Sequence, residues 1–254
     1  MMTAPKTVSV VGFKDSGKTR VVEAIVGELT ARGLRVGTLK HTVESMELDT
    51  PGKDTSRHRV AGAKASAILH DKAAAIFIDE YLTVMEAANH LGSLDVLVIE
   101  GFKTLSTHAR ILVPRYNEDV KSLSNGLEIA AVKLPSSSIS NDIGLPIYSL
   151  DDSSELVDLI MKKAYPMLPG ANCNGCGYDD CLGLGKAILK GEASAKSCVL
   201  NRSGFTLKVN DNPIPLNNFV RKALTRMLLG FVSTLQGGEK AAKVDLSFEV
   251  EEDE

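Results

Sequence analysis

A glycine-containing stretch near the amino end has residue types and spacing suited to binding phosphate. Residues 12–19 read Gly-Phe-Lys-Asp-Ser-Gly-Lys-Thr, which is the G-x4-G-K-T spacing of a phosphate-binding loop. Glycines let the backbone curl so that successive N–H groups face an anion, and a following helix points its positive end at the same place. Lys18 would then reach the terminal phosphates of a nucleotide, and Thr19 would ligate a magnesium ion.

The sequence on either side of this loop fits that interpretation. The apolar run 8–11 predicts a buried strand before the loop, and apolar residues at helical spacing over 21–29 predict a helix after it. An ordinary glycine turn entering a surface helix is the alternative. The residues expected to contact the nucleotide here are Gly12, Lys14, Asp15, Ser16, Gly17, Lys18, Thr19 and Arg20.

An acidic residue at the end of a second buried strand could complete a magnesium site. Residues 94–101 predict an apolar strand that terminates in Glu100, and such strands are typically buried on both faces of a parallel sheet. A magnesium-bound nucleotide needs a carboxylate, or a water held by one, beside the phosphate loop. We therefore predict Glu100 as the magnesium partner of Thr19. A capping or salt-bridged surface glutamate is the alternative.

Four cysteines lie close together in the last third of the chain, at Cys173, Cys176, Cys181 and Cys198. Glycines at 175 and 177 would let the backbone turn N–H groups toward anionic sulfurs, and a helix over 182–189 would bring the fourth cysteine back. The arrangement resembles the 4Fe-4S domain of the corrinoid iron-sulfur protein and of the RnfB electron-transfer subunit, over about 30 residues.

Two other interpretations of the cysteines stay open. Zinc also takes four thiolates in structural sites, although paired C-x2-C knuckles would favour it and this chain has one such pair. Four uncommitted thiols are the third option. The cluster could transfer electrons, sense oxygen or hold the small module together, since a unit of this size gains most of its folding free energy from metal ligation.

The composition excludes some classes of protein. A formal net charge of -3 and a pI near 6.0 argue against a general nucleic-acid binder, which would need an excess of Lys and Arg. The chain has neither an apolar run long enough for a membrane helix nor a signal-peptide core. We therefore expect a cytoplasmic protein that does not bind a membrane, in which clustered cysteines indicate metal rather than disulfides.

The order of apolar patterns predicts the fold. Strands are expected over 8–11, 34–39, 65–69, 74–78, 94–101, 109–113, 127–132 and 147–150, with helices over 81–90 and 154–164. This alternation predicts an α/β protein: a P-loop NTPase-like three-layer sandwich with a mainly parallel sheet. A small four-cysteine metal-cluster module and a C-terminal α+β piece would be added to it.

The expected domain boundaries follow from the breaks in these patterns. Residues 1–168 would form the nucleotide-binding domain, 169–202 the four-cysteine module, and 203–254 the C-terminal piece. In that last part we expect a hairpin of 205–209 with 214–216, and a helix beginning at Asn217 or Asn218 whose apolar face packs in a core or against a second copy. A strand over 244–250 and a solvated acidic tail would follow.

Several segments together resemble the MobB family, over roughly residues 6–165. They are the loop 12–19, Lys40-His41, the segment from Asp49 to Ala63 and the segment from Val98 to Lys103. The most specific of them is the segment 49–63, which reads Asp-Thr-Pro-Gly-Lys-Asp-Thr-Ser-Arg-His-Arg-Val-Ala-Gly-Ala. Two departures are Thr42-Val43, where members often have further histidines, and Arg20, where many members have a threonine.

The resemblance implies a homodimeric GTP-binding adaptor of molybdopterin-guanine dinucleotide synthesis with at most weak GTPase activity. It would assist MobA, the nucleotidyltransferase that joins GMP to molybdopterin, and molybdopterin enzymes are further expected partners. GTP, Mg2+ and a 4Fe-4S cluster would be the cofactors. Because the chain lacks an N-K-x-D guanine-reading motif, the choice of GTP over ATP depends on the resemblance alone.

The polar segment after the second strand is a further candidate for ligand contacts, because long polar loops at the carboxyl ends of parallel strands commonly bind ligands. Five residues of this segment could contact nucleotide, magnesium or a pterin phosphate: Asp49, Lys53, Asp54, Arg57 and His58. A solvated loop residue is the alternative for each. The function expected overall is a GTP-binding accessory protein of molybdenum or tungsten cofactor synthesis, and the alternative is a nucleotide-gated electron-transfer or metal-delivery factor.

Overall fold

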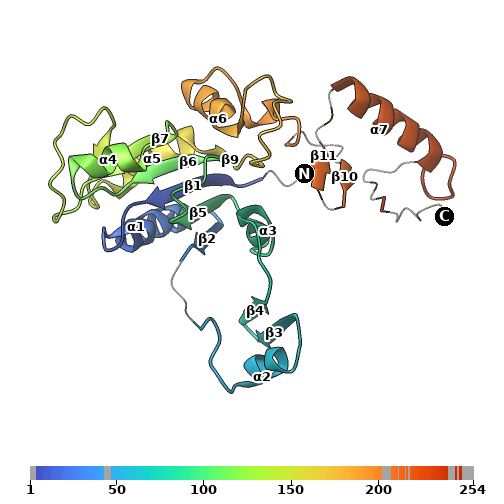
Figure 1. Ribbon diagram of the computed structural model, residues 1–254, viewed down its shortest axis with the longest axis horizontal. Helices are drawn as coiled ribbons and strands as arrows, with labels where there is room; N and C mark the ends of the chain where they lie inside the picture. Colours follow the sequence, from blue (N-terminus) through green and yellow to red (C-terminus); the bar gives the residue numbers. More distant parts are fainter. Residues whose placement is uncertain are drawn as a thin grey trace.

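A mainly parallel sheet forms the centre of the protein in the computed structural model (Figure 1). The structure describes residues 4–42, 47–201, 207–210, 212–214, 216, 218–239, 244 and 246–247. The seven-stranded sheet has the order β2-β5-β1-β6-β7-β8, with β9 paired antiparallel to β1. Its strands are β1 (Lys6–Val11), β2 (Val36–Lys40), β5 (Val96–Glu100), β6 (Ala109–Leu112), β7 (Glu128–Val132), β8 (Ile147–Tyr148) and β9 (Tyr165–Pro166).

Helices cover both faces of this sheet, which confirms the predicted three-layer α/β architecture. On one face, α1 (Lys18–Ala31) and α5 (Ser153–Lys163) share a core with alternate residues of β1, β5, β6 and β7. On the other face, α3 (Val84–Asn89) packs on β5 and α4 (Asn117–Leu123) packs on β1, β6 and β7. Strand β5 is fully buried from Val96 to Ile99, as its continuous apolar run predicts.

Two elements of the sheet domain were not predicted. Helix α4 begins after Tyr116, where the Asp119 carboxylate accepts the N–H groups of Arg115 and Tyr116. Strand β9 replaces the chain break expected at Pro166. Because β6 pairs with β1 only from Val8 onward, the backbone of Lys6 and Thr7 is left open on that side, and β9 pairs there.

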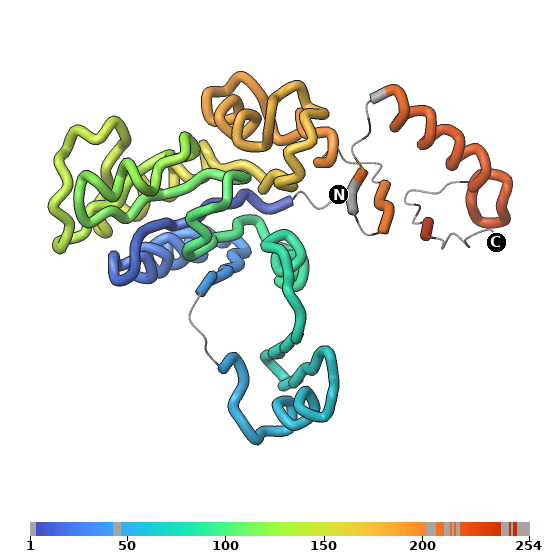
Figure 2. The backbone as a smooth tube through the Cα atoms, viewed as in Figure 1, coloured from blue at the N-terminus to red at the C-terminus, as the bar shows by residue number. Residues whose placement is uncertain are grey.

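A second unit lies apart from the sheet (Figure 1, Figure 2). It contains α2 (Asp54–Val60) and the antiparallel pair of β3 (Ala65–His70) and β4 (Ala73–Ile78), which confirms the strands predicted over 65–69 and 74–78. Its apolar side chains are poorly covered: Val60 is 86% exposed, Leu69 80% and Ile76 56%. A two-stranded hairpin of this size is marginally stable by itself.

The C-terminal part contains α6 (Cys181–Lys190), the short 3-10 turn η1 (Ala195–Ser197), β10 (Leu207–Val209), β11 (Asn212–Ile214) and α7 (Asn218–Val232). The hairpin and the helix confirm the predictions. Core packing of α7 is wrong for the described residues, because Phe219 and Phe231 are 80% and 69% exposed. Of the strand expected over 244–250, Val244, Leu246 and Ser247 are not in a strand, and the remaining residues and the acidic tail lie outside the described residues.

Within the described ranges, none of the helices combines the length and the apolar character needed to cross a lipid bilayer.

Candidate functional site

The glycine loop begins where β1 ends, between two neighbouring strands. The N–H of Gly101, just after β5, donates to the Val10 carbonyl, and the N–H of Val113, just after β6, donates to the Val11 carbonyl. The loop therefore emerges at the carboxyl edge of the sheet, where β1 lies between β5 and β6. In open α/β sheets, ligands bind at this edge and at such a point.

The backbone of the loop is shaped by close contacts. A Cβ added at Gly12 would lie 2.7 Å from the Val113 carbonyl oxygen and would collide with the Ser16 hydroxyl. Asp15 (φ 59°) and Gly17 (φ 86°) are left-handed, which is a strained conformation for an aspartate. The Ser16 hydroxyl is buried without a hydrogen-bond partner. A crowded glycine loop with an unpaired buried hydroxyl suits the binding of an anion.

Lys18, the first residue of α1, folds back over this loop. Its ammonium donates to the Phe13 carbonyl at 2.7 Å. Burial lowers the pKa of Lys18, and the charges of Lys103 and Lys40 lower it further, whereas Glu100 raises it. The ammonium is therefore held beside other cations in a partly buried position, which a polyanion such as a triphosphate would neutralise.

Glu100 meets the loop as the sequence predicts. Its carboxylate accepts the Thr19 hydroxyl at 3.0 Å and forms an ion pair with Lys40 at 3.3 Å, and its side chain is only 12% exposed. The register explains this meeting, because Glu100 pairs with Val10 of β1 and with Lys40 of β2. A hydroxyl and a carboxylate beside a phosphate loop are the oxygen ligands that Mg2+ prefers.

Lys40 and Lys103 belong to this site, although no role was predicted for either. Lys103 lies 4.6 Å above the ring of Phe13, a loop residue, and its charge acts on Lys18. Lys40 is the last residue of β2, and Lys103 lies three residues after the end of β5. Both positions near strand ends were visible in the sequence. Gly101 and Phe102 lie between Glu100 and Lys103. Both are left-handed, at φ 95° and 52°, so the chain after Glu100 turns sharply.

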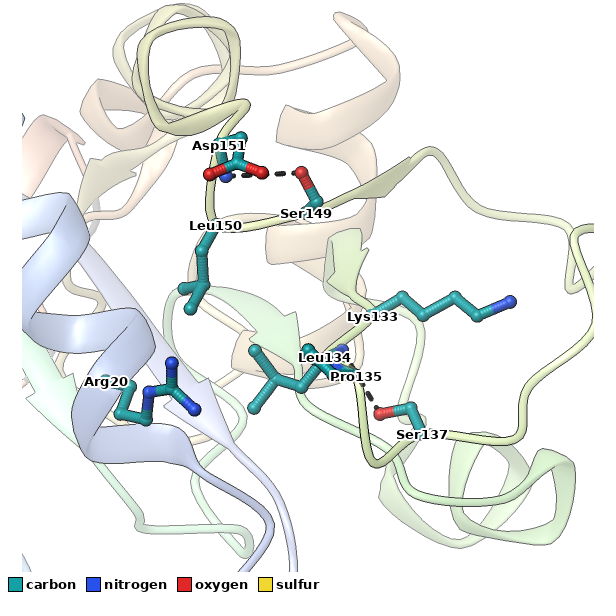
Figure 3. A pocket seen from close by; sticks show the side chains of 8 residues that line it. All are labelled: Arg20, Lys133, Leu134, Pro135, Ser137, Ser149, Leu150 and Asp151. Carbon is teal, nitrogen blue, oxygen red and sulfur yellow. Dashed lines mark hydrogen bonds between the residues drawn. The ribbon is translucent and has the colours of Figure 1, made fainter.

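A cavity of about 440 Å³ opens beside the loop (Figure 3). It reaches α1 through Arg20, which follows Thr19, and its other walls come from the segments after β7 and β8. A Cβ at Gly17 would collide with the Leu134 side chain, so the loop and the cavity wall are in contact. The lining residues are Arg20, Lys133, Leu134, Pro135, Ser137, Ser149, Leu150 and Asp151.

The structure does not bring Asp49 to the glycine loop. Asp49 lies in the second unit, where its carboxylate pairs with Arg59 at 3.5 Å, and Arg59 also pairs with Asp79 at 2.6 Å. The segment therefore folds onto its own hairpin. Lys53, Asp54, Arg57 and His58 are exposed on the same unit. Lys14 and Asp15 are exposed on the loop itself.

Cys176, Cys181 and Cys198 belong to the apolar cluster at the start of α6, and Cys173 precedes them in the loop before that helix. Cys181 is the first residue of the helix, whose end is capped by the Asp180 carboxylate, and the Cys181 N–H donates to the Asn172 amide oxygen at 3.0 Å. Cys181 and Cys198 are buried, whereas Cys173 and Cys176 are half-buried. Asn172, Asn174 and Gly177 are all left-handed, so the loop coils tightly before the helix.

The chemistry of the donors fits a metal cluster. Burial raises the pKa of the Cys198 thiol, and the neighbouring Cys181 and Cys176 raise this pKa further. The backbone N–H groups of Asn201 and Leu200 donate to the Cys198 sulfur and lower its pKa. Such N–H groups stabilise thiolates that bind metal. Among the described residues, no group of three or more His, Cys, Asp or Glu lies close enough to hold a single metal ion.

The module packs directly on the sheet domain. A Cβ at Gly185, in the middle of α6, would lie 2.6 Å from the Tyr165 hydroxyl and 2.9 Å from Leu127. The Lys163 ammonium at the end of α5 donates to the Leu189 carbonyl at 3.0 Å. Cys181, Leu184 and Cys198 belong to the same buried cluster as α1 and α5. The module and the sheet domain therefore share one apolar core.

Two protein families match this chain. Residues 7–134 match the family described as molybdopterin guanine dinucleotide synthesis protein B, or MobB. Residues 168–200 match a family described as "Putative Fe-S cluster". The second match confirms the iron-sulfur interpretation at the level of the family, while the narrower likeness to the corrinoid iron-sulfur protein and RnfB stays a prediction.

Known relatives extend the first match to nearly the whole chain. A protein of Methanocaldococcus jannaschii, named "Putative molybdopterin-guanine dinucleotide biosynthesis adapter protein", is 30% identical over 96% of this chain and 98% of its own length. A Bacillus subtilis protein, named "Probable molybdopterin-guanine dinucleotide biosynthesis adapter protein", is 31% identical over 61% of this chain and 91% of its own length. The crystal structure of Bacillus subtilis MobB superposes with a TM-score of 0.53 at 28% identity, covering 65% of this chain and 99% of that one.

Proposed function

Because the chain belongs to the MobB family, we propose that it is an adapter protein of molybdopterin-guanine dinucleotide synthesis that binds Mg-GTP in its glycine loop. The relatives carry that adapter function in their names, and those names include a guanine nucleotide product. They do not favour the alternative of a nucleotide-gated electron-transfer or metal-delivery factor.

One observation carries the nucleotide part of the proposal. The Glu100 carboxylate accepts the Thr19 hydroxyl at the mouth of a loop whose buried Ser16 hydroxyl has no partner. This combination is what a magnesium-bound phosphate chain requires, because amides and a hydroxyl face the anion and a carboxylate faces the metal.

Each residue of the site has a role in this proposal. The backbone of residues 12–19 surrounds the phosphates, and Lys18 leaves the Phe13 carbonyl to bind the terminal phosphates. Lys40 and Lys103 add positive charge at the same end. Thr19 and Glu100 ligate Mg2+, directly or through water. The arrangement positions a triphosphate, and hydrolysis is expected to be slow unless a partner completes the site.

Cys173, Cys176, Cys181 and Cys198 would hold the iron-sulfur cluster, for which we propose the 4Fe-4S type. The bound cluster would cross-link the loop before α6 to the segment after it. The residues around it bury Cys181 and Cys198 and supply N–H donors to the Cys198 sulfur.

The division of the chain into 1–168, 169–202 and 203–254 is part of this proposal. So is a homodimer, because the unit of α2, β3 and β4 exposes Val60, Ile68 and Leu69, which a second copy would cover. The expected partners are a MobA-like nucleotidyltransferase and molybdopterin enzymes, which are the proteins an adapter of this synthesis would join.

The nucleotide site is tested with Lys18→Ala. Titration calorimetry with Mg-GTP should show affinity falling about 100-fold or more, because the charged contacts to the phosphates are lost. Lys72→Ala, on the exposed turn of the β3–β4 hairpin, is the matched control and should bind as wild type. Equal affinity of Lys18→Ala and wild type would remove the phosphate-loop assignment.

The adapter role is tested by capture of a MobA-type transferase on immobilised protein with GTP and Mg2+. Retention by wild type that is lost with Lys18→Ala would support a nucleotide-dependent adapter. If neither wild type nor Lys18→Ala retains the transferase, the adapter function is contradicted, while the nucleotide site is unaffected by that result.

A further inference from the structure

The cavity beside the glycine loop lies where the rest of a bound nucleotide must go. A triphosphate in the loop enters at the start of α1, and Arg20, two residues into that helix after Lys18, is a cavity wall. Leu134 forms another wall and touches Gly17 of the loop. The cavity also lies at the carboxyl ends of β7 and β8, the same edge of the sheet that carries the loop. One nucleotide can therefore occupy both the glycine loop and the cavity.

The walls of the cavity suit a flat aromatic ring. Leu134, Pro135 and Leu150 supply apolar surface, and Figure 3 shows the Leu150 side chain pointing toward Leu134 and Arg20. The Arg20 guanidinium is a planar cation that can stack on an aromatic face. At about 440 Å³ the cavity falls within the range of small-molecule sites.

A single carboxylate stands at the polar edge of this cavity. The turn after β8 is fixed by its own hydrogen bonds: the Asp152 carboxylate accepts the Ser149 N–H at 2.7 Å and the Ser149 hydroxyl at 2.8 Å. The Asp151 N–H donates to the Ser149 hydroxyl oxygen at 3.2 Å. The Asp151 carboxylate is exposed and has no hydrogen-bond donor within the described part of the chain. A rigid turn thus presents two acceptor oxygens to a ligand.

We propose that this cavity binds the purine base of the nucleotide and that Asp151 selects guanine. This inference rests on the proposed nucleotide site and adds its base-reading residue. Guanine presents the N1–H and the 2-amino group on one edge, which match the two carboxylate oxygens. Adenine presents the N1 lone pair on that edge, which a carboxylate repels. Leu134, Leu150 and Arg20 hold the ring, and Asp151 reads its edge.

The location explains why no guanine motif is visible in the sequence. The chain has no N-K-x-D stretch, and the segment after β7 reads Lys-Leu-Pro-Ser. The acidic residue instead follows β8, which neighbours β7 in the sheet. Arg20 has a role in this proposal as a cavity wall.

Asp151→Asn tests this proposal, because one nucleotide should bind more weakly and another more tightly. Asparagine keeps one acceptor and gains one donor, so it mismatches the 2-amino group of guanine and matches the 2-oxo group of xanthine. Calorimetry with Mg2+ and GTP, ITP, XTP or ATP should show that wild type prefers GTP. In Asp151→Asn, GTP affinity should fall roughly 10- to 100-fold and XTP should bind more tightly than in wild type.

Two controls separate base reading from folding and from phosphate binding. Asp142→Asn changes another exposed aspartate, on the loop between β7 and β8, and should leave all affinities unchanged. Inorganic triphosphate has no base, so it should bind wild type and Asp151→Asn equally.

The outcomes distinguish this inference from the proposed function. If wild type binds neither triphosphate nor any nucleotide, the phosphate-loop assignment fails and the base pocket fails with it. If wild type binds GTP and ATP equally and Asp151→Asn changes nothing, the base pocket is overturned while the phosphate loop stands. If Asp151→Asn weakens every nucleotide and inorganic triphosphate alike, Asp151 is structural and the inference is also overturned.

Discussion

The glycine loop of residues 12–19 is held by the sheet, whereas the four cysteines are carried by one helix and the loops on either side of it. The loop emerges between β5 and β6, and neighbouring strands supply its contacts through Glu100 and Val113. The cysteines stand on a tight coil before α6 and on the segment after η1. Both motifs have fixed spacing, but neighbouring strands hold the first, whereas loops around a single helix carry the second.

This difference indicates which site depends on its ligand for shape. The loop already has its left-handed residues, its crowded Gly12 and its Thr19–Glu100 hydrogen bond. Small metal-binding units obtain much of their folding free energy from ligation. We therefore expect a glycine loop that forms without nucleotide and a module that is completed by its cluster.

The largest effect that would test this contrast is loss of a cysteine. In Cys198→Ser, bound iron and visible absorption of anaerobically purified protein should fall to near zero, because the buried fourth thiolate is lost. Mg-GTP affinity should stay close to wild type, since the loop takes its contacts from the sheet. Iron analysis and calorimetry on the same sample measure both.

Two results would contradict this expectation. Wild-type protein that is colourless and contains one zinc would replace the cluster with a structural zinc site. A loss of GTP affinity in Cys198→Ser as large as in Lys18→Ala would show that the loop depends on the module, and the contrast between the two sites would fail.

The next effect concerns the contact between the module and the sheet. In Gly185→Ala the new methyl group would meet the Tyr165 hydroxyl at 2.6 Å and Leu127 at 2.9 Å, so α6 must move away from the sheet. Such overpacking should lower the free energy of unfolding by about 1–3 kcal/mol, measured by urea denaturation of the cluster-bound protein.

Gly183→Ala in the same helix is the matched control. Its methyl group would meet only the Asp180 carboxylate at 3.3 Å and Tyr178 at 3.7 Å, so its stability should equal or exceed that of wild type. If the two variants have the same stability, α6 is not held against the sheet by Gly185.

The sequence was sufficient to predict a site where one short stretch of residues forms most of it. The spacing of Gly12, Gly17, Lys18 and Thr19 predicts the loop, and the buried strand before Glu100 predicts its place beside it. The spacing of the four cysteines likewise favours an iron-sulfur module, and the matched family confirms that interpretation for residues 168–200, while the role of each cysteine stays a prediction.

The remaining features depend on which strands become neighbours. Lys40 approaches Glu100 because β2 pairs with β5, and the cavity forms because the segments after β7 and β8 meet α1. No single stretch of sequence contains that order. Asp49 was predicted near the ligand because its loop follows β2, but pairing with Arg59 holds it in the second unit. Tyr165 and Pro166 form a strand only because β1 offers unpaired backbone there.

The smallest effect separates metal binding from phosphate binding within the loop itself. Glu100→Gln keeps an oxygen that accepts the Thr19 hydroxyl but removes the negative charge. The Mg2+ concentration needed for half-maximal GTP binding should rise about five- to tenfold, roughly 1 kcal/mol, because one charged ligand is lost. In EDTA the variant should bind GTP as tightly as wild type or more tightly, since a carboxylate no longer repels the phosphates. Glu118→Gln, an exposed glutamate on α4, should match wild type in both buffers. Equal weakening with and without Mg2+ would mean that Glu100 only supports the loop, and the loop would then resemble the cysteine module in needing a charged partner for its shape.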